Sequence, residues 1–472
     1  SGTIEDSMQS IMEKATQAAE TMRRGGGIGY DFSNIRPNGD RIVSLGSSAS
    51  GPVSFMHIYD AVCRTIVSAG HRRGAMMGVL RVDHPDIEEF IRAKRNGHAL
   101  TNFNISVGVT NEFMECVINQ QPFDLKFNDQ VYTQIDANAL WDEIMRANWD
   151  WAEPGVLFID RINEDNPLAY CETIEATNPC GEQPLPPYGA CLLGSFNLVE
   201  YTCVTRVGSN LKFIFDYDQL RKDIPPIVRA MDNVIDRTNY PLHQQAIEAT
   251  QKRRMGLGVT GVGNAISLME MRYGKKESLA FIRKVLKTIT YTAYEASSDL
   301  ALEKGSFPLY NPAMYFEKGG QFIQRLPDPL KEKIGDQGIR NSHLMSIART
   351  VIGENGPSII KLKDYVWHYY NKKCETTEDL TVEDHLNMQI AAQPYIDSAI
   401  SKTINVGDKA TFEEFKNIYT DAWKGKLKGV TTFRLAGKRY GVLNKSEPAI
   451  KDELDGAACF YDPETGNKSC DL

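Results

Sequence analysis

The chain has 472 residues, of which 42% are hydrophobic and 24% charged, and its net charge is −8. This is ordinary globular composition, and the acidic balance argues against direct nucleic-acid binding. No apolar run approaches the roughly 20 residues of a membrane span, and the polar, acidic start lacks the features of a signal peptide. The nine cysteines suit neither a secreted disulfide framework nor a structural zinc site. We therefore expect a cytoplasmic protein, with no metal ligands of its own, that uses a few thiols for chemistry.

Helix and strand signals alternate along the chain. Apolar residues at helical spacing predict early helices over 7–24, 52–69 and 84–96. Strands, some with adjoining loops, are predicted within 25–42, 70–80, 102–110 and 155–160. This alternation favours an α/β fold of parallel strands with helical crossovers. From about Asn444 the periodicity is lost, which predicts a flexible tail.

Two glycine-rich stretches lend themselves to close contacts. The glycines of 25–29 (GGGIG) let the backbone approach a ligand or another segment, although they do not match the dinucleotide fingerprint G-x-G-x-x-G. A strand crowded by its neighbours explains them equally well. In 70–74 (GHRRG), Arg72 and Arg73 offer guanidinium groups that suit phosphate oxygens. A solvated basic turn is the simpler alternative there.

Cys180 stands out among the cysteines. Pro179 and Gly181 flank it, which predicts a loop or tight turn. If the backbone is extended there, Asn178 and Glu182 lie on the same side and gather an amide, a thiol and a carboxylate. Such a set can accept a proton, orient a hydroxyl and perform nucleophilic or redox work. A lone cysteine is more often a small buried apolar residue.

Three further cysteines bear on this interpretation. Cys191 follows Cys180 by eleven residues, which weighs against an isolated buried thiol. Cys459 and Cys470 lie in the predicted tail, where exposed thiols suit a reducing shuttle that exchanges with another disulfide. Incidental tail cysteines explain this pair equally well.

The amino-acid sequence resembles those of the ribonucleotide reductase catalytic subunits, most closely the class II type. The resemblance covers most of residues 5–443 in family order and does not depend on one motif. It is carried by GGGIGYDFSNIRPNGD, SGPVSFMHIYDAV, RRGAMMGVLRVDHPDIEEFI, NFNISVGVT, EPGVLFIDRIN, TNPCGEQPL, CLLGSFNL, RRMGLGVTGVGNAI, YIDSAISKTINV and KGVTTFR.

The resemblance implies a ten-stranded α/β barrel over 1–443 with a central finger loop that carries the radical cysteine, followed by a tail over 444–472. Cys180 would form the thiyl radical that removes the 3′-hydrogen of a ribonucleotide. Glu182 would take the 3′-hydroxyl proton, and Asn178 would bind the sugar. Such a radical needs a dry interior with fixed polar groups. No N-terminal ATP-binding regulatory domain is expected before the barrel.

The resemblance also implies how the thiols are used. Cys191 would be one of two thiols that reduce the 2′-carbon, and Cys459 and Cys470 would then reduce the resulting disulfide. The partner thiol of Cys191 would lie two residues before Ser1, outside this sequence. A thioredoxin or glutaredoxin type of protein would supply the electrons.

Binding loops follow from the resemblance as well. The loops over 35–48 and 70–74 would connect a dNTP effector to the substrate base, and 341–358 falls where the family binds substrate phosphate. The run ARTVIGENGPS there departs from the family's Pro-Thr-Gly-Thr. The candidate effector residues are Asp31, Arg36, Arg72 and Arg73. The candidate substrate-binding residues are Ser48, Asn341, Thr350 and Ser358.

Two radical sources remain open. Class I enzymes receive the radical from a ferritin-like subunit, which holds its own metal cofactor, through adjacent tyrosines. The corresponding strand here has Phe433 and Arg434 instead, which favours adenosylcobalamin. Tyr369 and Tyr370 are adjacent in another segment, where aromatic packing is the simpler explanation.

Other classes fit less well, and several partners stay unspecified. A glycyl-radical lyase needs a C-terminal glycine loop, a non-catalytic nucleotide-binding module has no need of the Cys180 set, and a thiol hydrolase needs a nearby histidine. The substrate is a ribonucleoside diphosphate or triphosphate. A homodimer through 7–24 and 52–69 is a further expectation.

Overall fold

The computed structural model describes residues 1–43, 46–66, 74–95, 99–207, 210–348, 375, 379–407, 409–434, 459–461 and 468–470. Helices and strands alternate through them, which confirms the α/β class. No described helix combines the length and apolar character that a membrane crossing requires.

A six-stranded sheet organises the first part of the chain. In spatial order its strands are β1 (Ile28–Asp31), β4 (Met76–Arg81), β5 (Phe103–Val109), β8 (Gly155–Phe158), β16 (Gly429–Arg434) and β15 (Thr403–Val406). The first four run parallel, as predicted, because helical crossovers join them. The exception is β16, which is antiparallel to β8 and parallel to β15. The sheet is therefore mixed where the late strands β16 and β15 join β8.

Helices cover the outer face of this sheet. They are α1 (Met8–Arg23), α2 (Gly51–Thr65), α3 (Ile87–Arg92), α4 (Asn111–Ile118), α5 (Ala137–Trp151) and α16 (Phe412–Lys424). Alternate β5 residues, Phe103, Ile105 and Val107, enter the same buried core as Trp141 of α5. The three predicted helices are thus present, although α2 ends at Thr65 rather than at residue 69. The hairpin of β6 (Pro122–Phe127) and β7 (Gln130–Asp136) adjoins them.

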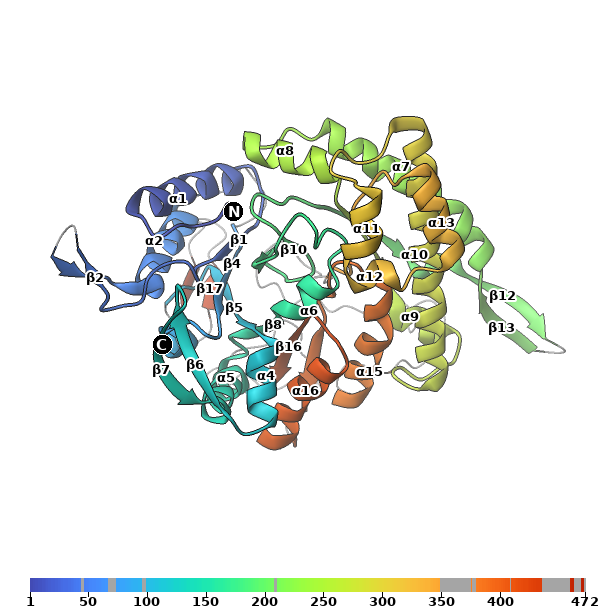
Figure 1. Cartoon of the computed structure of the whole chain (residues 1–472). Helices are drawn as coiled ribbons and strands as arrows, with labels where there is room; N and C mark the ends of the chain where they lie inside the picture. Colours follow the sequence, from blue (N-terminus) through green and yellow to red (C-terminus); the bar gives the residue numbers. More distant parts are fainter. Residues whose placement is uncertain are drawn as a thin grey trace.

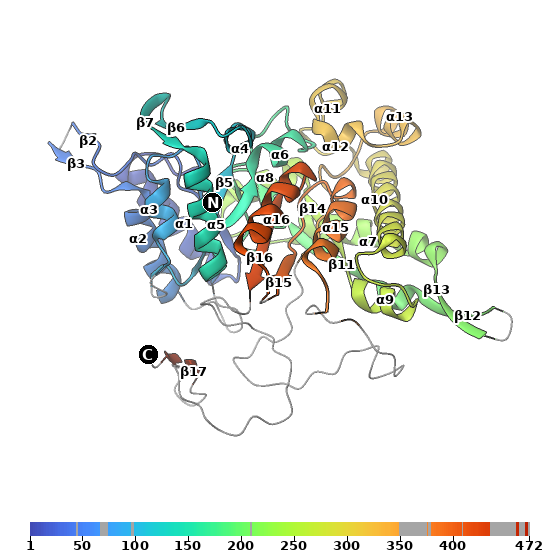
Figure 2. The ribbon, with the colours of Figure 1, turned by 90° about the horizontal axis from the view of Figure 1, so that it is seen from below.

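The second part has its own core around a smaller parallel pair, β11 (Leu192–Asn197) and β14 (Met255–Thr260). Parallel bridges extend the pair from Leu257 to Met345 and from Ile347 to Ile400, three residues before β15. Helices that pack around this core include α7 (Tyr217–Arg237), α10 (Lys276–Lys304), α13 (Asp328–Gln337) and α15 (Val382–Ala392). Figure 2 shows α1, α2, α3 and α5 on one side, α7, α10 and α13 on the other, and β16 with α16 between them.

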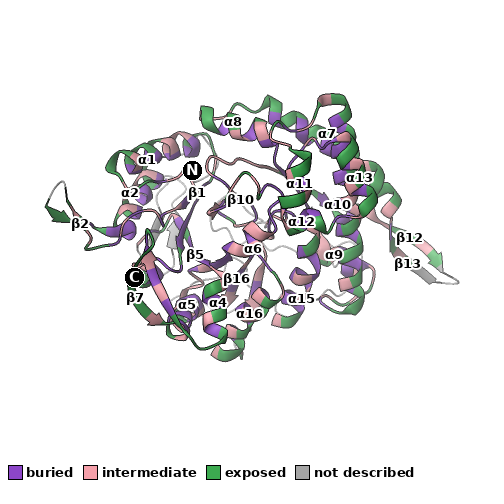
Figure 3. Ribbon diagram, in the orientation of Figure 1, coloured by how far each residue is buried: buried purple, intermediate pink, exposed green. Residues whose placement is uncertain are grey.

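Shorter elements connect these parts. The helical ones are α6 (Ile159–Glu164), η1 (Leu198–Tyr201), α8 (His243–Lys252), α9 (Val262–Leu268), α11 (Pro312–Lys318), α12 (Gly320–Gln324) and η2 (Gln393–Tyr395). The short hairpins are β2 (Arg41–Ile42) with β3 (Ser47–Ser48), β12 (Thr202–Val207) with β13 (Asn210–Phe215), and β17 (Cys459–Tyr461) with β18 (Lys468–Cys470). In Figure 1 the β2 and β12–β13 hairpins project from opposite ends of the molecule. Figure 3 shows buried residues along the strands and exposed ones on the outer helix faces.

A small hairpin, β9 (Ala176–Thr177) with β10 (Pro184–Leu185), lies against the inner side of the sheet. Figure 1 shows β10 in the middle of the molecule, between β5 and α11. Inner-face residues Met77, Val79 and Leu157 form an apolar cluster with Ile174, and Ala176 packs against it. The chain that leads into the hairpin is therefore held on the sheet by apolar contacts.

Gly29 of β1 makes this close approach possible. A Cβ atom at Gly29 would lie 1.8 Å from the carbonyl oxygen of Thr177 in β9. The predicted crowding of the 25–29 glycines by neighbouring backbone is therefore confirmed at this position. A side chain there would push the hairpin off the sheet.

We expect Gly29→Ala to lower the free energy of unfolding by about 1–3 kcal/mol or more, because backbone must move to admit the methyl group. Gly263→Ala in α9 is the matched control, since a Cβ there meets nothing within 4 Å. That variant should be neutral or slightly stabilised, because alanine favours helix. Urea unfolding of both variants measures the difference, and equal stabilities would contradict the role given to Gly29.

Candidate active site

The loop between β9 and β10 is a tight turn with Cys180 near its tip. The N–H of Gly181 donates to the carbonyl of Asn178 (3.1 Å), and the N–H of Asn178 donates to the carbonyl of Gln183 (2.9 Å). Asparagine at the first position, proline at the second and glycine at the fourth suit a β-turn, and Gly181 has φ +83°. The predicted turn around Cys180 is confirmed.

The side chain of Asn178 closes the loop. Its Oδ1 accepts the N–H groups of Gly181 (3.1 Å) and Gln183 (3.0 Å), and its Nδ2 donates to Glu182 Oε1 (2.9 Å). The amide and carboxylate therefore meet as expected. The premise of an extended backbone is wrong, because the turn itself brings them together. Cys180 is exposed while Glu182 is buried.

Both halves of the molecule hold this loop. From the second half, the N–H of Ala399 and the hydroxyl of Ser346 each donate to the carbonyl of Glu182 at 3.0 Å. From the six-stranded sheet, Asn104 Nδ2 donates to the carbonyl of Pro179 (2.8 Å). The backbone on each side of Cys180 is thus tied to a different part of the fold.

Buried charges support the second-half contacts. The carboxylate of Asp397 accepts the N–H of Leu344 (2.7 Å), the N–H of Met345 (3.0 Å) and the hydroxyl of Tyr294 (2.7 Å). Burial raises the pKa of Asp397, and these hydrogen bonds oppose that shift. The network joins the segment before Ser346 to the segment before Ala399.

Cys191 lies directly before β11. Its Sγ donates to the carbonyl of Leu192 (3.3 Å). Burial raises the pKa of this thiol, Arg254 opposes the shift, and the charges of Glu182 and Asp397 add to it. Cys191 is therefore within electrostatic reach of the Cys180 loop, and its thiol stays protonated at neutral pH.

Asp31 lies beside the same loop. It lines a cavity of about 70 Å³ together with Asn178, Thr177, Glu175 and other residues. Its Oδ1 accepts the hydroxyl (2.5 Å) and the N–H (3.1 Å) of Ser33. Burial raises its pKa to about 7, and the charge of Glu175 adds to the shift. The structure thus places Asp31 beside Asn178, and its role in effector binding stays a prediction.

The remaining candidates are placed elsewhere. Arg36 forms an ion pair with Asp6 (Nε–Oδ2, 2.6 Å). Ser48 is exposed on the projecting β2–β3 hairpin. Asn341 is fully buried, with its amide donating to Asp232 and to the carbonyl of Arg253 and its Oδ1 accepting from Ser297.

The structure therefore does not bring Ser48 or Asn341 to the loop, and their substrate-binding role stays a prediction. Four other candidates lie outside the described residues, namely Arg72, Arg73, Thr350 and Ser358.

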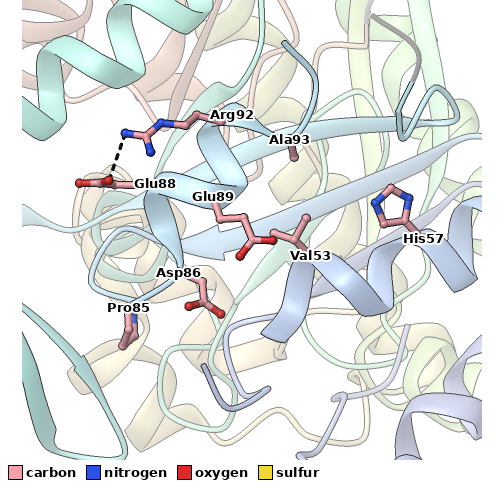
Figure 4. Close-up of a pocket in the computed structure, with 8 residues that line it drawn as sticks. All are labelled: Val53, His57, Pro85, Asp86, Glu88, Glu89, Arg92 and Ala93. Carbon is pink, nitrogen blue, oxygen red and sulfur yellow. Dashed lines mark hydrogen bonds and ion pairs between the residues drawn. The ribbon is translucent and has the colours of Figure 1, made fainter. Parts of the chain in front are cut away.

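A second pocket lies between α2 and α3. Figure 4 shows Asp86, Glu88 and Glu89 around it, with Glu88 paired to Arg92 and His57 on the opposite side. Burial raises the pKa values of Asp86 and Glu89, and the charge of Asp86 raises that of Glu89 further. Carboxylates repel phosphate groups, and no predicted site residue within the described ranges lines this pocket.

Sequence reasoning missed the residues that hold the loop from outside. Asn104, Ser346 and Asp397 lie in stretches that point to the family only by resemblance, and the sequence alone assigns these residues no role at the loop. One signal was available, because Asn104 is a polar residue within an otherwise largely apolar strand.

Comparisons with known proteins identify the family of this chain. Residues 2–353 and 349–433 match the family model described as ribonucleotide reductase, barrel domain. The chain belongs to the ribonucleotide reductase family.

Two relatives at 34% identity carry the same name. The chain is 34% identical to a vitamin B12-dependent ribonucleoside-diphosphate reductase of Mycobacterium tuberculosis, over 99% of this chain and 72% of that protein. A protein with the same name from Thermoplasma acidophilum is also 34% identical, over 95% and 62%. The ribonucleoside-diphosphate reductase large subunit of Vaccinia virus is 24% identical, over 94% and 62%. The predicted enzyme family and its resemblance to the class II type are confirmed.

The raised pKa of Asp31 makes a prediction for Asp31→Asn. In the unfolded chain this carboxyl ionises near pH 4, whereas in the folded protein it does so near pH 7. Stability is therefore lost as pH rises from about 4 to 7. The variant, which cannot ionise, should match the wild type at pH 4 and be more stable at pH 8 by about 4 kcal/mol, since each unit of pKa difference corresponds to about 1.4 kcal/mol. Thermal unfolding at both pH values measures this, and a pH-independent difference would contradict it.

Proposed function

We propose that this chain reduces ribonucleoside diphosphates to 2′-deoxyribonucleoside diphosphates through a thiyl radical on Cys180. The observation that carries the proposal is the Asn178–Cys180–Glu182 turn, which holds an exposed thiol beside a buried carboxylate and a half-buried amide. The diphosphate level follows the names of the relatives at 34% identity.

The residues of the loop divide the chemistry among them. The Cys180 thiyl takes the hydrogen atom from C3′, and the Glu182 carboxylate takes the 3′-hydroxyl proton. A pair of thiols, Cys191 and a second one, then supplies two electrons and two protons and becomes a disulfide. One of these protons lets the 2′-hydroxyl leave as water, and the other ends in the new C2′–H bond. Glu182 returns its proton to the 3′-oxygen, and Cys180 returns its hydrogen atom to C3′, which regenerates the thiyl. The raised pKa of Cys191 suits this role because its sulfur keeps the proton it must give.

Vitamin B12 in its adenosyl form is the radical source of this proposal. When bound, adenosylcobalamin supplies the radical that removes the hydrogen atom from the Cys180 thiol. The site fits such a group, because Cys180 is exposed at the loop tip while its neighbours stay anchored. Phe433 on β16 has no phenol with which to relay a radical from another subunit. The alternative of a ferritin-like partner is therefore not favoured.

We also propose that the strands close into the ten-stranded barrel. The bridges Leu257–Met345 and Ile347–Ile400 support this, because they continue the β11–β14 pair towards β15 at the edge of the six-stranded sheet. A closed barrel would surround the Cys180 loop and shield the radical from water.

The tail is proposed to re-reduce the site and to receive electrons from a thioredoxin or glutaredoxin type of protein. In the β17–β18 ladder Cys459 is the residue directly opposite Cys470. Opposed Cα atoms in such ladders lie about 4.5–5.5 Å apart, within the range of about 4.4–6.8 Å found for disulfides. We also propose that the chain binds a dNTP effector and forms a homodimer through α1 and α2.

The test is deoxynucleotide formation by the full chain with dithiothreitol, a dNTP, a ribonucleoside diphosphate and adenosylcobalamin, and no other protein. We expect turnover by the wild type and at least a thousand-fold loss in Cys180→Ser, because a serine hydroxyl cannot replace the thiol in radical transfer. Cys203→Ser is the matched control, since Cys203 is an exposed cysteine on the β12–β13 hairpin. Product from Cys180→Ser, or none from the wild type, would contradict the proposal.

A further inference from the structure

We infer that Asn104 is a positioning residue for Cys180, which its amide orients through the peptide carbonyl of Pro179. Nδ2 of Asn104 donates to that carbonyl at 2.8 Å, across 75 residues of sequence. The carbonyl belongs to the peptide group that also contains the N–H of Cys180. This inference rests on the proposed function, because it assigns Asn104 a part in the same radical transfer.

The sheet presents Asn104 to the loop. Its neighbours Phe103 and Ile105 point into the outer core, so alternation puts Asn104 on the inner face. Its register partner on β4 is Met77, which belongs to the inner apolar cluster with Ile174. The chain from Ile174 to Pro179 thus crosses this face of the sheet. Beyond the apolar contacts of Ile174 and Ala176, Asn104 holds this chain by its hydrogen bond to Pro179.

The bond complements the other contacts of the loop. Asn178 closes the turn from within, and Ser346 and Ala399 hold the carbonyl of Glu182 from the second half. Asn104 holds the carbonyl of Pro179 from the six-stranded sheet. Because Pro179 and Glu182 stand on either side of Cys180, these contacts fix the thiol from two directions.

The rate of radical transfer depends on how accurately the Cys180 thiol is positioned. A misplacement of about 1 Å between reacting groups can reduce the rate roughly a hundred-fold. One hydrogen bond contributes only about 0.5–1.5 kcal/mol to stability. Loss of the Asn104 bond should therefore reduce turnover far more than it reduces stability or nucleotide binding.

Two variants separate the hydrogen bond from packing. Asn104→Asp has the same shape, but its carboxylate cannot donate to the Pro179 carbonyl, whereas Asn104→Leu has no donor at any pH. We expect both to lower kcat ten- to a hundred-fold at pH 8 with KM unchanged. As pH falls, the introduced carboxyl becomes protonated and can donate again, so kcat of the aspartate variant should rise relative to that of the leucine variant. The Lys94–Glu153 ion pair contacts the backbone of β5 on either side of Asn104. Because both variants retain this pair, it does not affect the comparison between them.

Asn163→Ala is the matched control. Asn163 tethers the same segment upstream, with Nδ2 donating to the Ile174 carbonyl (2.9 Å) and Oδ1 accepting the Ile174 N–H (2.8 Å). Its loss should lower the melting temperature but leave kcat within about three-fold, because Ile174 is remote from the turn in sequence. Measured without cofactor, the calorimetric nucleotide affinity of the Asn104 variants should be unchanged and their melting temperatures lowered by only a few degrees.

The outcomes distinguish this inference from the proposed function. An inactive wild type would overturn the proposed function. An active wild type with Asn104 variants within two-fold of its kcat would overturn only the role of Asn104. A loss confined to the leucine variant, with the aspartate variant as active as the wild type at pH 8, would show packing rather than hydrogen bonding, and would also overturn it.

Discussion

The side chain of Asn178 makes the hydrogen bonds on which the site depends. One amide satisfies two backbone N–H groups and also donates to Glu182, so the turn and the carboxylate are fixed together. An aspartate in its place would accept the same two N–H groups but would repel Glu182. The amide therefore combines two tasks that no other side chain of this size performs. The exposure of Cys180 follows from the turn that this amide closes.

The surroundings of the loop explain why so many charges are buried in the second half. Lys428 donates to the carbonyls of Ile396, Asp397 and Ser398 and pairs with Asp165 at 2.9 Å. Burying such groups costs several kcal/mol unless each is paired, and the net gain in stability is small. What the network does is to fix the segment that ends at Ala399. That segment in turn holds the loop, so the ionic network serves the geometry of the site.

Sequence reasoning succeeded where the determinants are local. The turn at Cys180 could be predicted because proline and glycine restrict the backbone within four residues. The parallel strands and early helices could be predicted from periodicity, although the end of α2 could not. Asp31 was assigned to an effector site because it precedes the 35–48 loop. Only the folded chain shows it lining a cavity with Asn178.

The contacts that hold the loop could not be predicted in this way. Asn104 and Ser346 reach it across 75 and 164 residues of sequence. Periodicity shows which face of a strand is buried, but not which distant backbone atom a polar side chain on that face will bind. The same limit applies to Asn341, which the resemblance linked to phosphate and which the structure places in a buried network with Asp232.

The most direct test of this account is a crystal structure of Cys180→Ser with a ribonucleoside diphosphate and a dNTP. The account predicts that the ribose lies over the turn, with its 3′-hydroxyl within hydrogen-bond distance of Glu182 and Asn178 and its C3′ facing residue 180. An ordered nucleotide with its ribose away from the turn would contradict it. That result would leave the chain in its family but would remove the basis for assigning the chemistry to this loop.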